Sequence, residues 1–107
     1  MNSALLDKLK QFVEEEPNDP FNWYALALEY LKSDRAQALN IFTQLIARHP
    51  DYLPSYYQAG VLYSEQNQPE DAKTIFKKGI AIAKAQQEAK TAMELQQALQ
   101  ALIDYEE

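Results

Sequence analysis

A pattern of aromatic and small residues occurs twice in this chain. Matching residues lie 33 or 34 positions apart: Trp23 and Tyr56, Ala27 and Gly60, Tyr30 and Tyr63, Ala38 and Ala72, and Phe42 and Phe76. A period of roughly 20–50 residues is typical of one structural unit that is copied and stacked. The sequence therefore predicts a repeat architecture, and its function is expected on a surface rather than in a catalytic pocket.

The length and composition predict a single domain over residues 1–107 that holds no cofactor and no metal. A chain of 107 residues suits one domain, and 47% hydrophobic residues are enough for a packed core. It contains no Cys, which excludes disulfides, thiolate metal sites and thiol nucleophiles. Its two Gly residues leave little material for a glycine-rich phosphate loop.

The charge distribution disfavours nucleic acids and anionic membranes as partners. The formal net charge is −6, with sixteen acidic and ten basic residues and no basic run. Asp7 and Lys8 interrupt the N-terminal apolar residues, which is unlike a signal peptide. No apolar stretch approaches the roughly 20 residues of a membrane-spanning helix. We expect a soluble, cytoplasmic protein.

Apolar residues recur at helical spacing along the whole chain and predict an all-α fold of about six helices. Asn2 or Ser3 is expected to cap the first helix, which Pro17 ends. The helices are expected over residues 3–16, from 20 to 32, from 34 to before Pro50, from Pro54 to near Asn67, from Pro69 to a break at about 86–88, and over 89–105. The last helix is expected to pack through the apolar stripe Met93, Leu95, Leu99, Leu102 and Ile103.

Capping residues mark several of these boundaries. Asp19 is expected to cap the second helix, with Pro20 at the first helical position, where a missing N–H is harmless. Asp34 and Gln37 are similar to a capping box at the start of the third helix. Asn67 tolerates the left-handed conformation that commonly ends a helix.

The pattern resembles the tetratricopeptide repeat, whose 34-residue unit carries W, L-G, Y, A, F and P landmarks in that order. Leu26-Ala27 and Ala59-Gly60 stand at the L-G site, and Pro50 stands at the closing Pro. The small residues allow two helices of a pair to approach closely. The resemblance implies a right-handed α-α superhelix of helical hairpins. It assigns residues 3–16 to an incomplete leading repeat, 20–50 and 53–84 to two repeats, and 89–105 to a C-terminal capping helix.

In stacks of this kind, the first helix of each pair lines the concave side. The stripe opposite the landmark residues is then expected to face a groove: Tyr24, Leu28, Leu31, Tyr57, Gln58 and Val61. Some tetratricopeptide domains hold a peptide's C-terminal carboxylate there with Lys, Asn and Arg, and these residue types are missing from the matching positions of this chain. An apolar groove with tyrosines favours an amphipathic helix or an extended hydrophobic segment.

Two alternatives remain open at this point. The last helix of the chain could cover the stripe, in which case Leu28 and Val61 would be core residues, while Tyr24 and Tyr57 are the better candidates for contact with a partner. The apolar surface could also serve self-association, as in a homodimer or a scaffold. A protein-binding adaptor is the first hypothesis.

Catalysis is not expected. His49 is the one histidine, and without Cys it cannot build a usual zinc site of about four ligands. The acidic run Glu14–Glu16 is interpreted as solvated surface. The serines lack a nucleophile-elbow context.

Overall fold

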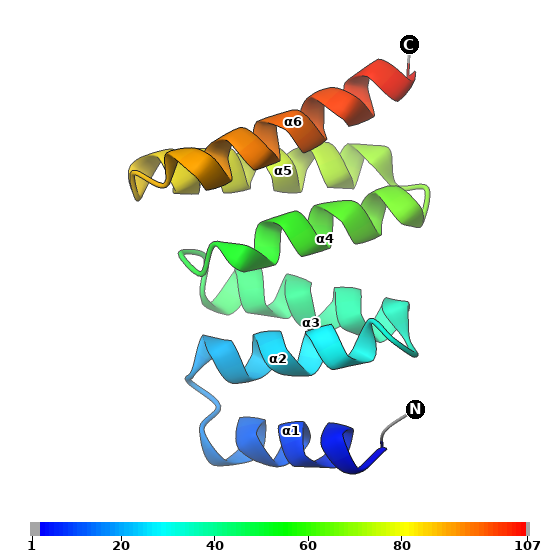
Figure 1. The fold of residues 1–107 in the computed structure, drawn as a ribbon, viewed down its shortest axis with the longest axis vertical. Coiled ribbons are helices and arrows are strands. Elements are labelled where there is room, and N and C mark those ends of the chain that lie inside the picture. Colours follow the sequence, from blue (N-terminus) through cyan, green and yellow to red (C-terminus); the bar gives the residue numbers. More distant parts are fainter. Residues whose placement is uncertain (1–2, 107) are drawn as a thin grey trace. The chain divides into compact units, whose positions relative to one another are not determined.

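The structure is a computed structural model, and it describes residues 3–106. Over this range the chain forms six α-helices and no strand, so the predicted all-α fold is confirmed. Its contacts divide it into two compact units, unit 1 up to Tyr52 and unit 2 from Leu53 onward. Each unit holds three helices (Figure 1). A cap by Asn2 lies outside the described residues, and so does the side chain of Ser3.

Unit 1 contains α1 (Ser3–Glu15), α2 (Pro20–Tyr30) and α3 (Arg35–Arg48), and α2 packs against both of the others. The carboxylate of Asp19 caps α2 by accepting a hydrogen bond from the Phe21 backbone N–H at 3.0 Å. The carboxylate of Asp34 caps α3 by accepting one from the Gln37 N–H at 3.0 Å. The Asp34 N–H itself donates to the Tyr30 carbonyl at 2.7 Å, so this donor of the expected capping box is satisfied by the preceding helix.

The core of unit 1 forms where small and large residues of α2 and α3 alternate. Ala27 and Ala38 are completely buried, as is the ring of Phe42. Trp23 holds the connection between α1 and α2, because its Nε1–H donates to the Pro17 carbonyl at 2.7 Å. The Arg48 guanidinium lies over the Trp23 ring, 5.6 Å from its centroid.

Unit 2 contains α4 (Pro54–Glu65), α5 (Pro69–Ala85) and α6 (Ala89–Glu106), and α5 packs against both α4 and α6. Both glycines lie at these contacts. A Cβ added to Gly60 would lie 2.3 Å from Cε1 of Phe76, and one added to Gly79 would lie 2.7 Å from Cβ of Tyr56. Only residues without a side chain fit such distances, so the glycines set how closely these helices approach.

The two turns of unit 2 have the same hydrogen-bond pattern. Asn67 and Gln87 both have φ of 60°, in the left-handed region. The next residue in each turn, Gln68 or Glu88, donates its backbone N–H to a carbonyl five residues earlier, at 2.9 and 2.8 Å. This is the Schellman arrangement that ends helices. This arrangement explains how α5 can end after Ala85, although neither Gly nor Pro stands between α5 and α6.

The packed face of α6 differs from the predicted stripe at one position. Met93 is 57% exposed, so its expected place on this face is wrong. Ala92 and Leu95 are buried instead. Met93 lies about 200° around the helix from Leu95, at about 100° per residue, and therefore points away from α5.

Candidate functional site

The six residues expected to face a groove fall into two sets of three. Tyr24, Leu28 and Leu31 belong to unit 1, where the first two lie on α2 and Leu31 directly follows it. Tyr57, Gln58 and Val61 lie on α4 in unit 2. The structure therefore brings the residues together within each unit, and each set is described by itself.

In unit 1, the ring of Tyr24 takes part in packing. It makes edge-to-face contacts with Phe42 and with Tyr52, each at 5.6 Å between ring centroids. Leu28 and Leu31 are half-buried. Burial raises the pKa of the Tyr52 phenol above its ordinary value of 10.0, and the nearby Tyr24 and Asp19 raise it further. Sequence reasoning missed Tyr52, because it lies in a connection between helices where no helical periodicity points to it.

Phe21 extends the surface of unit 1 and was also missed. Its side chain is 60% exposed. It precedes Tyr24, Leu28 and Leu31 by three, seven and ten positions, which places all four residues on one helix face. This spacing was readable from the sequence, so Phe21 could have been found with the other three.

In unit 2, Tyr57 is more accessible than its counterpart Tyr24. Its side chain is 44% exposed, and its ring centroid lies 6.4 Å from that of Phe76. Tyr24 contacts Phe42, the counterpart of Phe76, in a similar way. The difference between the units is Tyr52, because Gln86 stands 34 residues after it and offers no ring.

Val61 lines an open hollow in unit 2 with a volume of about 510 Å³. Its lining residues come mainly from the C-terminal halves of α4 and α6, so the hollow lies between these two helices. Both helices end on the same side of unit 2 (Figure 1). Its lining residues are Val61, Ser64, Glu65, Asn67, Phe76, Ala98, Ala101, Leu102 and Tyr105. Sequence reasoning missed the contribution of α6, because no pattern along the chain shows which residues of different helices surround a space.

An ion-pair network joins α5 to the end of α6 beside this hollow. The Lys73 ammonium donates to a Glu70 carboxylate oxygen at 3.0 Å and forms a second ion pair with Glu106. These hydrogen bonds, first that to Glu106 and then that to Glu70, raise the pKa of Lys73 above its ordinary value of 10.5. Lys73 is therefore charged throughout the physiological range and fixes Glu106 to α5.

Metal-binding and membrane-spanning elements have no candidate in the part of the chain that the structure describes. No three His, Asp or Glu side chains there are grouped so that they could hold a metal ion. None of the helices within residues 3–106 combines the length and the apolar character needed to cross a membrane. His49 is half-buried at the end of α3.

Comparisons with known proteins agree with the architecture. The family model described as tetratricopeptide repeat matches residues 30–103. A tetratricopeptide repeat domain protein from Salinibacter ruber is 39% identical to this chain. The match to its solution structure covers 81% of this chain and 89% of the S. ruber chain, with a TM-score of 0.77. A crystal structure of the S. ruber domain is likewise 39% identical. That match covers 78% of this chain and 96% of the S. ruber chain, with a TM-score of 0.75.

A more distant structure is similar in fold alone. A protein from Bordetella parapertussis is 18% identical, and the match covers 94% of this chain and 88% of that protein with a TM-score of 0.79. A comparison with curated proteins found no match.

Proposed function

The chain belongs to the tetratricopeptide repeat family, whose fold is a protein-interaction module without catalytic function, and from this premise we propose that it is a cytoplasmic adaptor that binds a segment of another protein. The proposed binding residues are Tyr24, Leu28 and Leu31 in unit 1, and Tyr57, Gln58 and Val61 in unit 2. The assignment of residues 20–50 and 53–84 to repeats, with 3–16 and 89–105 flanking them, is part of the same proposal.

One observation carries this proposal: an exposed tyrosine on α4 stands beside an open hollow with a mainly apolar lining. Tyr57 is 44% exposed, and Val61, one turn further along, lines the hollow. Tyr combines a large contact area with one polar group and is enriched at interfaces. An amphipathic helix or an extended hydrophobic segment would bury both side chains.

The residue types at these positions argue against recognition of a peptide's C-terminal carboxylate. Charge-assisted recognition of a carboxylate relies on cationic donors, and none of the six proposed binding residues carries a charge. The partner is therefore expected to contribute apolar side chains.

Contact between two copies of the chain is the second candidate function. The exposed ring of Tyr57 would suit such a contact as well as it suits a foreign segment. Sedimentation velocity distinguishes the two candidates. A monomer over the micromolar range agrees with the adaptor, whereas a dimer that dissociates on Tyr57→Ala agrees with self-association.

Affinity capture from the native cell extract tests the adaptor directly. We expect proteins retained by the wild type to be lost with Tyr57→Ala and kept with Met93→Ala. The second variant removes another large exposed apolar side chain, one that does not line the hollow. Circular dichroism should show unchanged helicity in both. An identical set of captured proteins for all three chains would refute the proposed surface.

A further inference from the structure

The lining of the hollow in unit 2 is mainly apolar, and the hollow is large enough to hold side chains of a partner. Phe76, from α5, is 2% exposed and is the most buried of the lining residues. Val61 from α4 and Leu102 from α6 are half-buried at its sides. Its volume of about 510 Å³ falls in the range of roughly 300–1,000 Å³ seen for ligand sites in proteins.

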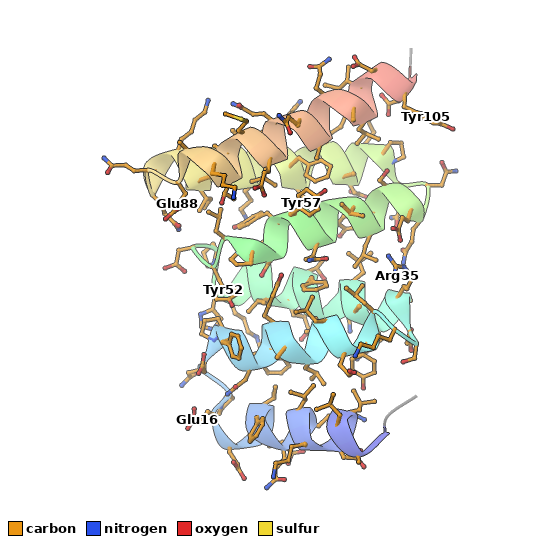
Figure 2. All side chains as sticks on the ribbon, in the orientation of Figure 1. Glu16, Arg35, Tyr52, Tyr57, Glu88 and Tyr105 are labelled. Carbon is orange, nitrogen blue, oxygen red and sulfur yellow. The ribbon has the colours of Figure 1, made fainter. Side chains whose placement is uncertain are left out.

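Small residues on α6 keep this space open. Ala98 and Ala101 line the hollow with methyl groups, where longer side chains would fill it. Tyr105, one turn further, is 89% exposed and lies at the C-terminal end of α6 (Figure 2). The hollow thus has an apolar interior and an aromatic side chain at its outer end.

The end of unit 2 that holds the hollow is strongly acidic. Here α4 ends, α5 begins and α6 ends (Figure 1). Five acidic residues and one basic residue, Lys73, lie within these termini, and Lys73 is already hydrogen-bonded to two of the five. The acidic residues are Glu65, Glu70, Asp71, Asp104 and Glu106. Glu65 lines the hollow itself, and no Lys or Arg is among its described lining residues.

At two of these three helix ends, the helix dipole also favours a positively charged ligand. The C-terminal ends of α4 and α6 both lie at this end of unit 2, and a helix C-terminus favours cations. The N-terminal end of α5 has the opposite polarity, but Glu70 and Asp71 in its first turn already match it. A ligand with positive charge is therefore favoured next to the hollow.

This charge decides between the possible occupants. A second copy of the chain would bring the same acidic end, and like charges across an interface oppose association. Building on the proposed function, we propose that the hollow between α4 and α6 binds a basic amphipathic helix of a partner protein. An apolar side chain of that helix enters between Val61 and Leu102, and a Lys or Arg next to it pairs with Glu65. Apolar anchors spaced i, i+3 or i+4, and i+7 are the pattern such a helix presents to a groove.

Selection from a display library of random 16-residue peptides against the immobilised full chain tests the chemistry of the partner without presupposing it. We expect the recovered peptides to combine apolar residues at i, i+3 or i+4, and i+7 with an excess of Lys and Arg. Apolar peptides with no excess of basic residues, or with an acidic excess, would overturn this inference but leave the proposed function intact. Failure to recover any peptide would count against both.

Two pairs of matched variants then locate the binding. Ala98→Leu fills the hollow and should abolish binding of the selected peptide, whereas Ala81→Leu adds the same bulk at an exposed position of α5 and should leave it unchanged. Glu65→Lys should weaken binding about tenfold, since a hydrogen bond to a charged group contributes about 1.5 kcal/mol or more. Glu88→Lys makes the same charge change at the opposite end of unit 2 (Figure 2) and should have little effect.

Fluorescence anisotropy of a labelled selected peptide measures these affinities, and circular dichroism checks that each variant is folded. Equal weakening by Glu65→Lys and Glu88→Lys would show non-specific attraction to an acidic protein and would refute the site. Undiminished binding by folded Ala98→Leu would place the peptide elsewhere.

Discussion

At the scale of single residues, Gly60 shows how closely two helices of unit 2 approach each other. A Cβ at this position would lie within 2.7 Å of three atoms of the buried Phe76 ring. Alanine would gain about 1 kcal/mol in helix propensity over glycine. Overpacking in a core costs typically about 1–3 kcal/mol. The steric term should exceed the gain in propensity, because three ring atoms lie too close to the added methyl group and the whole ring would have to shift.

We therefore expect Gly60→Ala to lower the free energy of unfolding, and Gly60→Leu to lower it by more, about 3 kcal/mol or beyond. Urea denaturation monitored by circular dichroism measures both. Combining Gly60→Ala with Phe76→Leu should recover part of the loss, since the smaller side chain leaves room for the methyl group. Unchanged stability of Gly60→Leu would show that α4 and α5 do not pair as described.

At the scale of helices, the ends are set by local chemistry, and Asp34 is the clearest example. Its carboxylate accepts a hydrogen bond from the Gln37 N–H, one of the N–H groups that a helix start leaves without an intrahelical partner. Loss of such a cap costs typically about 1 kcal/mol, with a range of about 0.5–2 kcal/mol.

Asp34→Ala is expected to lower the free energy of unfolding by this amount, while Asp34→Asn, which keeps an acceptor oxygen, should retain most of it. Chemical denaturation of the three chains at pH 7 gives the comparison. A loss of stability as large in Asp34→Asn as in Asp34→Ala would mean that the negative charge, rather than the hydrogen bond, stabilises α3.

The two turns of unit 2 differ in how well they could be predicted from the sequence: the turn at Asn67 was predicted, whereas the turn at Gln87 could be located only approximately. Asn67 was predicted to be left-handed, because a short amide side chain tolerates this conformation. Gln87 adopts the same φ without that advantage. The close packing of α6 on α5 requires a tight turn between them, since a Cβ added to Gly79 would lie only 3.1 Å from Cδ1 of Leu95. Tertiary contacts thus determined a conformation that local preference did not indicate.

At the scale of the whole molecule, both units contain a group that resists deprotonation. Burial raises the pKa of Tyr52 in unit 1, and hydrogen bonds to Glu106 and Glu70 raise that of Lys73 in unit 2. A group with a raised folded-state pKa binds its proton more tightly in the native state than in the unfolded state. Its contribution is complete below the unfolded pKa, near 10, and is lost as the pH rises through the folded value.

Stability is accordingly expected to be insensitive to these two groups below about pH 9 and to fall above about pH 10. Thermal melts between about pH 8 and about pH 11.5 cover the titration range of both groups and measure this dependence. Tyr52→Phe removes one titrating group, and Glu106→Gln removes the main cause of the shift at Lys73, so each should flatten the alkaline decline. The decline would have another origin if neither variant altered its slope.

The candidate site was only partly predictable. The spacing of Tyr24, Leu28, Tyr57 and Val61 placed each of them on a particular helix face, because helical geometry relates sequence positions directly to faces. The contribution of α6 to the hollow could not be predicted in the same way. It depends on how α4 and α6 lie on α5, and this arrangement results from the sum of many contacts, among them those at Gly60 and Gly79.

The number of helices, most of their ends and the family could be predicted from the amino-acid sequence, because they depend on periodicity and on capping residues that act over a few positions. Which of two equivalent tyrosines is accessible depends on packing in the folded chain. Tyr24 and Tyr57 occupy matching positions, and each lies against the matching phenylalanine. Tyr52 adds a second ring against Tyr24, while Tyr57 stays 44% exposed. The exposure of a side chain depends on neighbours that are distant in the sequence, and these come together only in the folded chain.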